Sequence, residues 1–345
     1  MIKYRLLQYD NYIDFILLWC VQNIIGRVFM NIAISLNEQY FHYTYVMLYS
    51  LFRNNSSGIT VYVLNRDLSD YSIKEFINLA ETYGNKIVNL RIDEKTLDVD
   101  LPTTKAWSLE IYFRLMLPDL LPYEVDKILY LDVDMIVDKK INDLYETELG
   151  EYVFGVVEDI LPTDEVRVSL LGNLFENGHK YFNSGMLLIN VEAWRKKYNI
   201  KFYLSVLKEI DYKVLAPDQD LLNYVHSGEV KYLDGGKYNV FCGIAHCLGK
   251  NYKYIKDSAY IIHFTGTKPW DNNCLHFDIE MLWWDYAKET KYYDYLIDTF
   301  IYRMTDERES EKNLMELENS IMELTQRINK AIELKEKIKR LTERR

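Results

Sequence analysis

The feature that most constrains this chain is a regular alternation of strand-like and helix-like segments between residue 30 and about residue 304. Parallel strands need crossover connections that are usually helices, so this alternation predicts an α/β fold with a mostly parallel sheet covered by helices on both faces. Ligands of such sheets bind beyond the carboxyl ends of the strands, which makes polar residues there the first candidates for a site. Strands are expected at residues 31–36, 59–64, 86–92 and 126–131, and helices up to Arg53, over residues 69–80 and over residues 107–117, ending at Pro118.

Composition excludes several classes of function. The net charge of −11 argues against a nucleic-acid partner, because neutralising phosphates requires a basic surface. No stretch reaches the roughly 20 apolar residues of a membrane span, and residues 15–26 lack the pattern of a signal peptide. We therefore expect a cytoplasmic protein, with peripheral attachment to the inner face of the membrane as the alternative. The four cysteines lack metal-site spacing and are expected to be free thiols.

Residues 1–29 contain no turn chemistry and no pattern that suggests a partner element. Met30 opens the first expected strand, and codons for Gly26-Arg27 allow a bacterial ribosome-binding sequence just upstream of it. We expect residues 1–29 to be an extension that is not part of the natural protein, residues 30–304 to be one domain and residues 305–345 to be a tail. The alternative for the extension is a helix packed on the domain.

The tail contains no Gly or Pro and is rich in charge. Apolar residues recur in it at alternating spacings of three and four from Leu314 to Ala331, which predicts a helix over about residues 313–341 that associates with a second copy. Two alternatives remain open. The helix would lie on its own domain, or its basic end, residues 335–345, would touch anionic lipid.

Two carboxylates stand at the end of the most apolar strand. Residues 128–131 run directly into Asp132-Val133-Asp134. Residues i and i+2 of an extended chain point the same way, so both carboxylates face one point. Desolvating them there is costly without a cation, which favours a metal site over a pair of solvated turn aspartates.

A second polar segment follows another apolar strand, in the order His263-Phe264-Thr265-Gly266-Thr267-Lys268-Pro269-Trp270. A histidine alone is more often a core residue with satisfied hydrogen bonds. Beside two carboxylates, His263 becomes a candidate third ligand for Mn²⁺ or Mg²⁺. Gly266 would let the backbone approach an oxygen, and Lys268 would supply a positive charge to a phosphate.

Two further segments carry amides and carboxylates. Asn183-Ser184-Gly185 precedes an apolar run and is expected either to place an amide on a sugar hydroxyl or simply to form a turn. In Asp218-Gln219-Asp220, either aspartate is also a candidate helix cap.

These four segments together resemble the retaining glycosyltransferases of the family that includes bacterial lipopolysaccharide galactosyltransferases and glycogenin, the family 8 type. The resemblance covers about residues 30–300 and rests on Y-L-D-V-D, F-N-S-G-M-L-L-I-N, D-Q-D-L-L-N and H-F-T-G-T-K-P-W. It implies the GT-A fold, with a Rossmann-like nucleotide-binding sheet, a UDP-sugar donor and a divalent metal. The acceptor stays open and is a glycan, a lipid-linked molecule or a protein.

The resemblance also implies a role for each matching residue. Asp132, Asp134 and His263 would hold the metal, with Gly266 and Lys268 on the diphosphate. Tyr40 would stack on uracil, beside Asn37, where many relatives have Asp; Asn still accepts a hydrogen bond from the base. The remaining donor contacts would come from Arg114, Asp159, Asn183, Asp218 and Gln219.

The expected function is thus metal-dependent transfer of a hexose, glucose or galactose, with retention. Because Gln219 is a poor nucleophile, we favour same-face attack by the acceptor hydroxyl over a covalent intermediate on Asp218. Residues 161–180 lack a period and are expected to form a loop that closes over the donor. The alternatives are a nucleotidyltransferase that makes nucleotide sugars, although its glycine-rich loop is missing, and a non-catalytic scaffold that acts through the tail.

Overall fold

The structure is a computed structural model that describes residues 29–55, 58–93, 109–160, 164–271, 274, 278–305, 315 and 322. The proposed extension and the self-associating tail therefore lie almost entirely outside the described residues, and both stay predictions, as do the domain boundaries. Within the described ranges, no helix has the length and apolar character needed to cross a membrane.

The elements alternate along the chain as the sequence predicts. The large sheet contains β1 (Met30–Ser35), β2 (Ile59–Asn65), β3 (Lys86–Arg91), β4 (Lys127–Leu131), β6 (Phe154–Glu158), β7 (Phe182–Asn190) and β8 (Val230–Tyr232), and a small sheet contains β5 (Met135–Val137), β9 (Val240–Phe241) and β10 (Ile261–His263). The α-helices are α2 (Phe41–Asn54), α3 (Asp70–Thr82), α4 (Leu117–Leu120), α5 (Asn142–Tyr145), α6 (Glu165–Glu176), α7 (Val191–Lys197), α8 (Ile200–Glu209), α9 (Pro217–Val225), α10 (Cys242–Cys247), α11 (Tyr252–Ser258), α12 (Met281–Ala287) and α13 (Tyr293–Thr305). Short 3₁₀ helices are η1 (Glu38–Tyr40), η3 (Leu109–Met116) and η4 (Asp278–Glu280).

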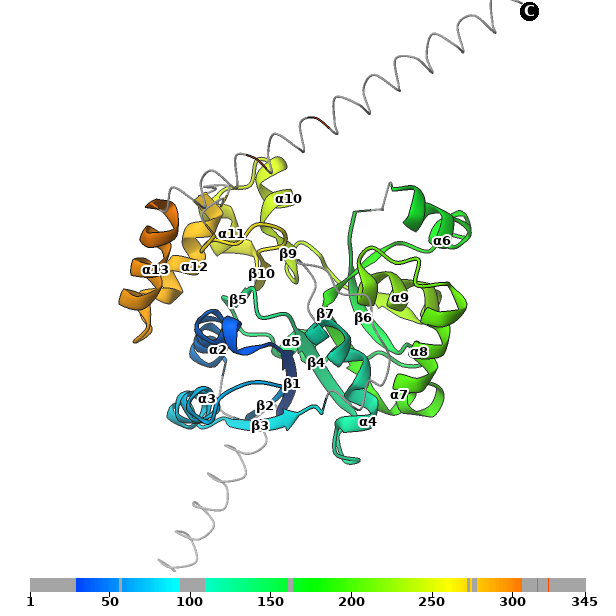
Figure 1. Cartoon of the computed structure of the whole chain (residues 1–345), viewed down its shortest axis with the longest axis horizontal. Helices are drawn as coiled ribbons and strands as arrows, with labels where there is room; N and C mark the ends of the chain where they lie inside the picture. Colours follow the sequence, from blue (N-terminus) through cyan, green and yellow to red (C-terminus); the bar gives the residue numbers. More distant parts are fainter. Residues whose placement is uncertain are drawn as a thin grey trace, which may run out of the picture.

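The large sheet has seven strands in the order β3-β2-β1-β4-β7-β6-β8 (Figure 1). Only β7 runs against its neighbours β4 and β6, and every other adjacent pair is parallel. The expected mostly parallel α/β sheet is thus confirmed. In the small sheet, β10 lies between β5 and β9, antiparallel to β5 and parallel to β9.

The large sheet is buried on both faces, which explains why its central strands are continuously apolar. In β1, Ile32 and Ile34 belong to one core together with residues of α2 and α3, whereas Ala33 belongs to a second core with residues of η3, α7 and α9. Figure 1 shows α2 and α3 on one side of the sheet and α4, α7, α8 and α9 on the other. Polar groups gather instead at the carboxyl ends of the strands.

Two expectations about local structure are wrong. The helix expected to stop at Pro118 instead continues from η3 into α4, with Pro118 in the first turn of α4. Proline has no N–H and a fixed φ, which suits the first turn of a helix, where the N–H would lack a partner. Pro118 therefore lies in the first turn of a helix rather than ending one.

The expected loop over residues 161–180 contains helix α6, capped by Asp164, whose side chain accepts a hydrogen bond from the N–H of Arg167 at 2.8 Å. Leu171 is the one residue of α6 that is buried. A helix that buries so little needs no regular apolar stripe, so its sequence shows no helical periodicity of apolar residues. The sequence signal for this helix was its capping residue, Asp164.

Helix α3 begins as expected, because the Ser69 hydroxyl accepts a hydrogen bond from the Ser72 N–H at 3.2 Å. We predict that Ser69→Ala lowers the free energy of unfolding by about 1 kcal/mol, since an orphan N–H loses its partner. Urea denaturation measures the change. Ser205→Ala, at an exposed position inside α8, is the control and should stay within about 0.5 kcal/mol of the parent protein. Equal losses in both variants would contradict the capping role.

Candidate active site

Two sheets bring three candidate metal ligands together. Asp132 follows β4, Asp134 precedes β5, and His263 ends β10, which pairs with β5 so that His263 lies opposite Met135. His263 Nε2 is 3.1 Å from Asp134 Oδ1 and 3.9 Å from Asp132 Oδ2. One ligand atom from each residue lies within 4.8 Å of the others. The expected trio thus converges on one point.

The orientation of the His263 ring suits a metal site. Its Nδ1 lies 2.8 Å from Oδ1 of Asn239, whose Nδ2 donates to Asn183 Oδ1 at 3.0 Å. An amide oxygen only accepts, so Nδ1 carries a proton, and Nε2 is the ring nitrogen that faces the two carboxylates. Two carboxylates and an imidazole nitrogen form a donor set that suits Mn²⁺ or Mg²⁺, so the residues present fit a divalent cation.

The backbone of β7 passes directly beside these ligands at Gly185. A Cβ at this position would lie 2.5 Å from His263 Cε1 and 2.6 Å from Asp132 Oδ2. The carbonyl of Gly185 also accepts a hydrogen bond from the Asp132 N–H at 2.8 Å, which holds the end of β4 against β7. Glycine is required here for close approach, a role that the sequence pattern alone did not reveal.

Lys268 closes the site next to the candidate metal ligands. Its ammonium pairs with the carboxylate of Asp134 and donates to the Phe264 carbonyl at 2.9 Å. Burial by itself raises the pKa of Asp134, but the charge on Lys268 and the contact with His263 hold it well below its usual value. Gly266 has φ of +79°, a left-handed conformation that favours glycine, so it forms the turn that returns Lys268 to the site.

Arg114, from η3, lies between two carboxylates. Its Nη2 donates to Asp132 Oδ1 at 2.9 Å, its Nε is 3.2 Å from Asp218 Oδ2, and its Nη1 donates to the Ser184 carbonyl at 2.6 Å. The side chain is 5% exposed. Burial opposes its charge, but Asp132 and Asp218 outweigh burial and raise the pKa of Arg114. The arginine therefore joins Asp132, a candidate metal ligand, to the first turn of α9.

The expected sugar-side residues form one hydrogen-bonded cluster. Asn183 Nδ2 donates to Asp159 Oδ2 and to Gln219 Oε1, both at 3.1 Å, and Gln219 Nε2 donates to Asp159 Oδ2 at 3.2 Å. Asn183 and Gly185 lie inside β7, which corrects the expectation that they precede the strand. Next to them the register of β6 against β7 shifts between Gly155 and Val157. Strand residues next to such an irregularity can have the sequence of a turn, which is why the start of β7 was not expected here.

Neither aspartate of α9 is the residue at its N-cap, which is Ala216. Asp220 nevertheless stabilises the turn before the helix, because its Oδ2 accepts hydrogen bonds from the N–H groups of Leu215 and Ala216, both at 2.9 Å. Asp218 instead faces Arg114, and burial raises its pKa. The cap-like role thus belongs to Asp220, and Asp218 is left for the site.

The expected base-binding residues follow β1. Oδ1 of Asn37 is buried without a hydrogen-bond partner among the described residues, and the same is true of the hydroxyl of Thr267, beside Lys268. Burial raises the pKa of Tyr40, and the charge on Lys268 offsets part of that rise, so this phenol lies near Lys268. Buried polar atoms rarely lack partners in folded proteins, and these atoms are candidates to meet a ligand.

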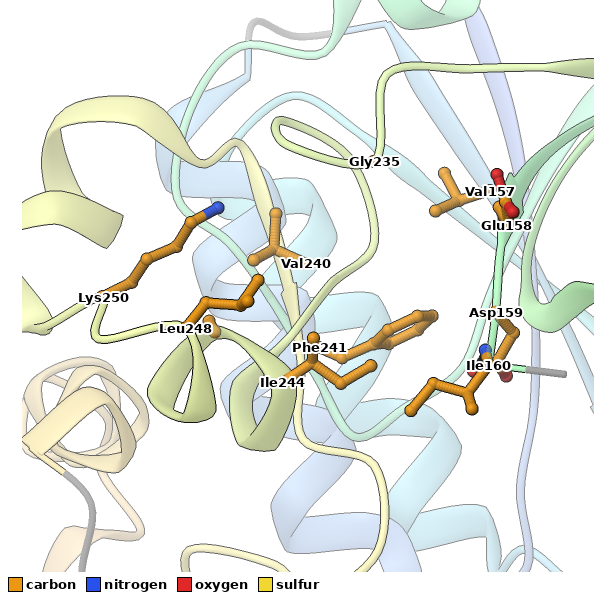
Figure 2. Close-up of a pocket in the computed structure, with 11 residues that line it drawn as sticks. Val157, Glu158, Asp159, Ile160, Gly235, Val240, Phe241, Ile244, Leu248 and Lys250 are labelled. Carbon is orange, nitrogen blue, oxygen red and sulfur yellow. Dashed lines mark hydrogen bonds between the residues drawn. The ribbon is translucent and has the colours of Figure 1, made fainter.

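A cavity of about 330 Å³ opens beside Asp159. Figure 2 shows the ring of Phe241 pointing toward the strand that carries Val157 and Asp159. The centre of this ring is 6.0 Å from that of His263, so the cavity adjoins the polar site. Its remaining wall is mostly apolar and consists of Ile160, Gly235, Val240, Ile244, Ala245, Leu248, Glu158 and Lys250.

Comparison with solved structures defines the fold. The crystal structure of the galactosyltransferase LgtC in complex with donor and acceptor sugar analogues matches with a TM-score of 0.65 and 23% identity, over 76% of this chain and 96% of that one. This likeness shows the GT-A fold of glycosyltransferases.

Sequence comparison defines the family. The profile of glycosyl transferase family 8 matches residues 31–274, and the chain belongs to this family; it is a glycosyltransferase. Lipopolysaccharide 1,2-glucosyltransferase of Escherichia coli K12 is 32% identical over 248 residues, 70% of this chain and 72% of that protein. Lipopolysaccharide 1,3-galactosyltransferase of Salmonella typhimurium LT2 is 29% identical, with the same two shares covered.

Proposed function

We propose that this glycosyltransferase is metal-dependent and retaining, and that it moves glucose or galactose from a UDP-sugar to a hydroxyl of a surface glycan. The observation that carries the proposal is the convergence of Asp132, Asp134 and His263 within 4.8 Å, beside the ammonium of Lys268. The choice of hexose and of acceptor rests on the names of the relatives, which are lipopolysaccharide glucosyl- and galactosyltransferases. The buried side-chain oxygen of Asn37, which has no hydrogen-bond partner among the described residues, suits the imide N–H of uracil.

The residues of the site divide the work of the reaction. Asp132, Asp134 and His263 would hold the cation, which stabilises the negative charge that develops on the departing diphosphate. Lys268 would add a second positive charge from the loop after β10. Asn183, Asp159 and Gln219 would bind sugar hydroxyls, because their amide and carboxylate groups already form one polar cluster.

Retention of the anomeric configuration is best explained if the acceptor hydroxyl attacks the sugar on the face from which the diphosphate departs. The bond between the anomeric carbon and the diphosphate oxygen breaks, the acceptor oxygen bonds to that carbon, and the acceptor proton passes to the leaving oxygen. Gln219 is an amide and a poor nucleophile. Asp218, the covalent alternative, is 5% exposed and faces Arg114, which disfavours its attack on a sugar.

Incubation with a panel of nucleotide sugars and Mn²⁺ tests the proposal. Release of UDP from UDP-glucose or UDP-galactose, stopped by a chelator, is the expected result. A nucleotidyltransferase would instead consume UTP and a sugar 1-phosphate and release pyrophosphate. A scaffold would turn over neither set of substrates. UDP release unaffected by the chelator would contradict metal dependence.

Lys268 is expected to act on phosphate rather than to hold the cation. We predict that Lys268→Ala lowers the rate of UDP release on the order of 10²-fold, the usual loss when one charge-stabilising donor is removed. The remaining activity should still require Mn²⁺, because the three ligands are intact. Residual turnover that persists in a chelator would contradict this division of roles.

A further inference from the structure

We propose that Asn239 is a positioning residue that joins the metal ligand His263 to the sugar-side cluster through a single side-chain amide. The inference rests on the proposed metal-dependent function. Asn239 directly precedes β9, and β9 pairs with β10, the strand that ends at His263. The two residues are therefore held side by side by the small sheet.

Both the oxygen and the nitrogen of the Asn239 side-chain amide form hydrogen bonds. Its Oδ1 accepts from His263 Nδ1 at 2.8 Å, and its Nδ2 donates to Asn183 Oδ1 at 3.0 Å. The residue is fully buried, so no water replaces either contact at its surface. A hydrogen bond to Nδ1 of a metal-binding histidine fixes the tautomer and the ring orientation, so that Nε2 faces the ion.

The contact with Asn183 fixes the orientation of a second amide. Asn183 Oδ1 accepts both from Asn239 Nδ2 and from the N–H of Gly185, at 2.9 Å. Its Nδ2 is thereby turned to the opposite side, where it donates to Asp159 and Gln219. Loss of the Asn239 donor would remove one of the two contacts that keep this amide from flipping.

The backbone conformation at position 239 also limits which residue types can occupy it. Asn239 has φ of +54°, in the left-handed region that asparagine tolerates better than most residues other than glycine. A residue here must accept the left-handed backbone, accept a hydrogen bond and donate one. Asparagine meets all three requirements, whereas aspartate lacks the donor and glycine lacks both side-chain contacts.

Two substitutions separate the two contacts. Asn239→Gly keeps the backbone conformation and removes both, and the affinity for Mn²⁺ alone, measured from the electron paramagnetic resonance signal of the free ion, should fall 10- to 100-fold. Asn239→Asp keeps an acceptor for His263, so the Mn²⁺ affinity should stay within about threefold of the parent. Its kcat for UDP release should nevertheless fall, with KM for Mn²⁺ unchanged, because Asn183 loses a donor.

A spectroscopic readout and a control keep the test independent of activity. The ring ¹⁵N signals of His263 should show the proton on Nδ1 in the parent and in Asn239→Asp, and a mixture of tautomers in Asn239→Gly. Asn55→Ala removes another buried amide, whose hydrogen bonds go to Ile141, Leu51 and Lys139 rather than to residues of the site, and should leave Mn²⁺ affinity unchanged. Parent-like Mn²⁺ affinity and tautomer in Asn239→Gly would overturn the inference, whereas a parent protein that binds no Mn²⁺ would overturn the proposed function.

Discussion

Asp134→Asn is expected to lower metal-dependent UDP release by on the order of 10²–10³-fold while the protein stays folded. The substitution preserves shape but removes the charge that faces both His263 Nε2 and the ammonium of Lys268. A cation held by fewer charges would be bound weakly and out of place over the diphosphate, and a few kcal/mol of lost charge stabilisation accounts for the fall in rate. Initial rates over a range of Mn²⁺ concentrations measure it, and Asp132→Asn and His263→Ala should behave alike.

Asp138→Asn is the matched control for this prediction. Asp138 follows the same strand, β5, at its other end; it is buried and, like Asp134, is paired with a lysine, here Lys256 at 2.6 Å. Its loss should lower stability but leave the rate per folded molecule unchanged. Wild-type turnover in Asp134→Asn, or an equal loss in both variants, would show that the carboxylate has no special part in the chemistry.

Gly185→Ala is expected to lower activity about 100-fold through displacement alone, since the added carbon would overlap His263 and Asp132 at 2.5 and 2.6 Å. No real Cβ tolerates such distances, so the ligands or the strand must shift, and a displacement of about 1 Å costs on the order of 10² in rate. The affinity for Mn²⁺ should fall in parallel. Steady-state kinetics and Mn²⁺ titration of the same preparation measure both effects.

Gly172→Ala provides the comparison. A Cβ at Gly172, inside α6, would meet nothing within 4 Å, and alanine favours helix over glycine by roughly 0.5–1 kcal/mol. This variant should be slightly more stable and fully active. Parental activity in Gly185→Ala would contradict the close approach of β7 to the candidate metal ligands.

The parts of the fold that are predictable from sequence are those where one local pattern decides the outcome. The apolar run of β4 followed by Asp132 and Asp134 marks a strand and its carboxyl end, since both periodicity and burial cost point the same way. Ser69 marks the start of α3 for a similar reason: the capping hydroxyl acts on its own backbone neighbours.

The parts that are not predictable depend on which segments meet. Asn239 precedes a strand of two residues, and nothing in K-Y-N-V-F shows that this strand pairs with β10 beside His263. Gly185 looks like a turn residue because its partners, His263 and Asp132, come from other elements. Helix α6 escaped the apolar pattern because it buries only Leu171. Roles fixed by long-range packing leave no local signal.

Because β7 is paired on both edges, it limits where this enzyme tolerates insertions and deletions. Asn183 and Gly185 lie near the start of a nine-residue strand that is paired with β4 on one edge and β6 on the other. Deleting one residue from β7 would turn every side chain after the deletion to the opposite face, and a deletion at Phe182 would exchange the faces of Asn183 and Ser184. Insertions and deletions should therefore accumulate in the connections around α6 and α10 and be absent from β7, so that related enzymes differ in loop length at the cavity while keeping this strand at constant length.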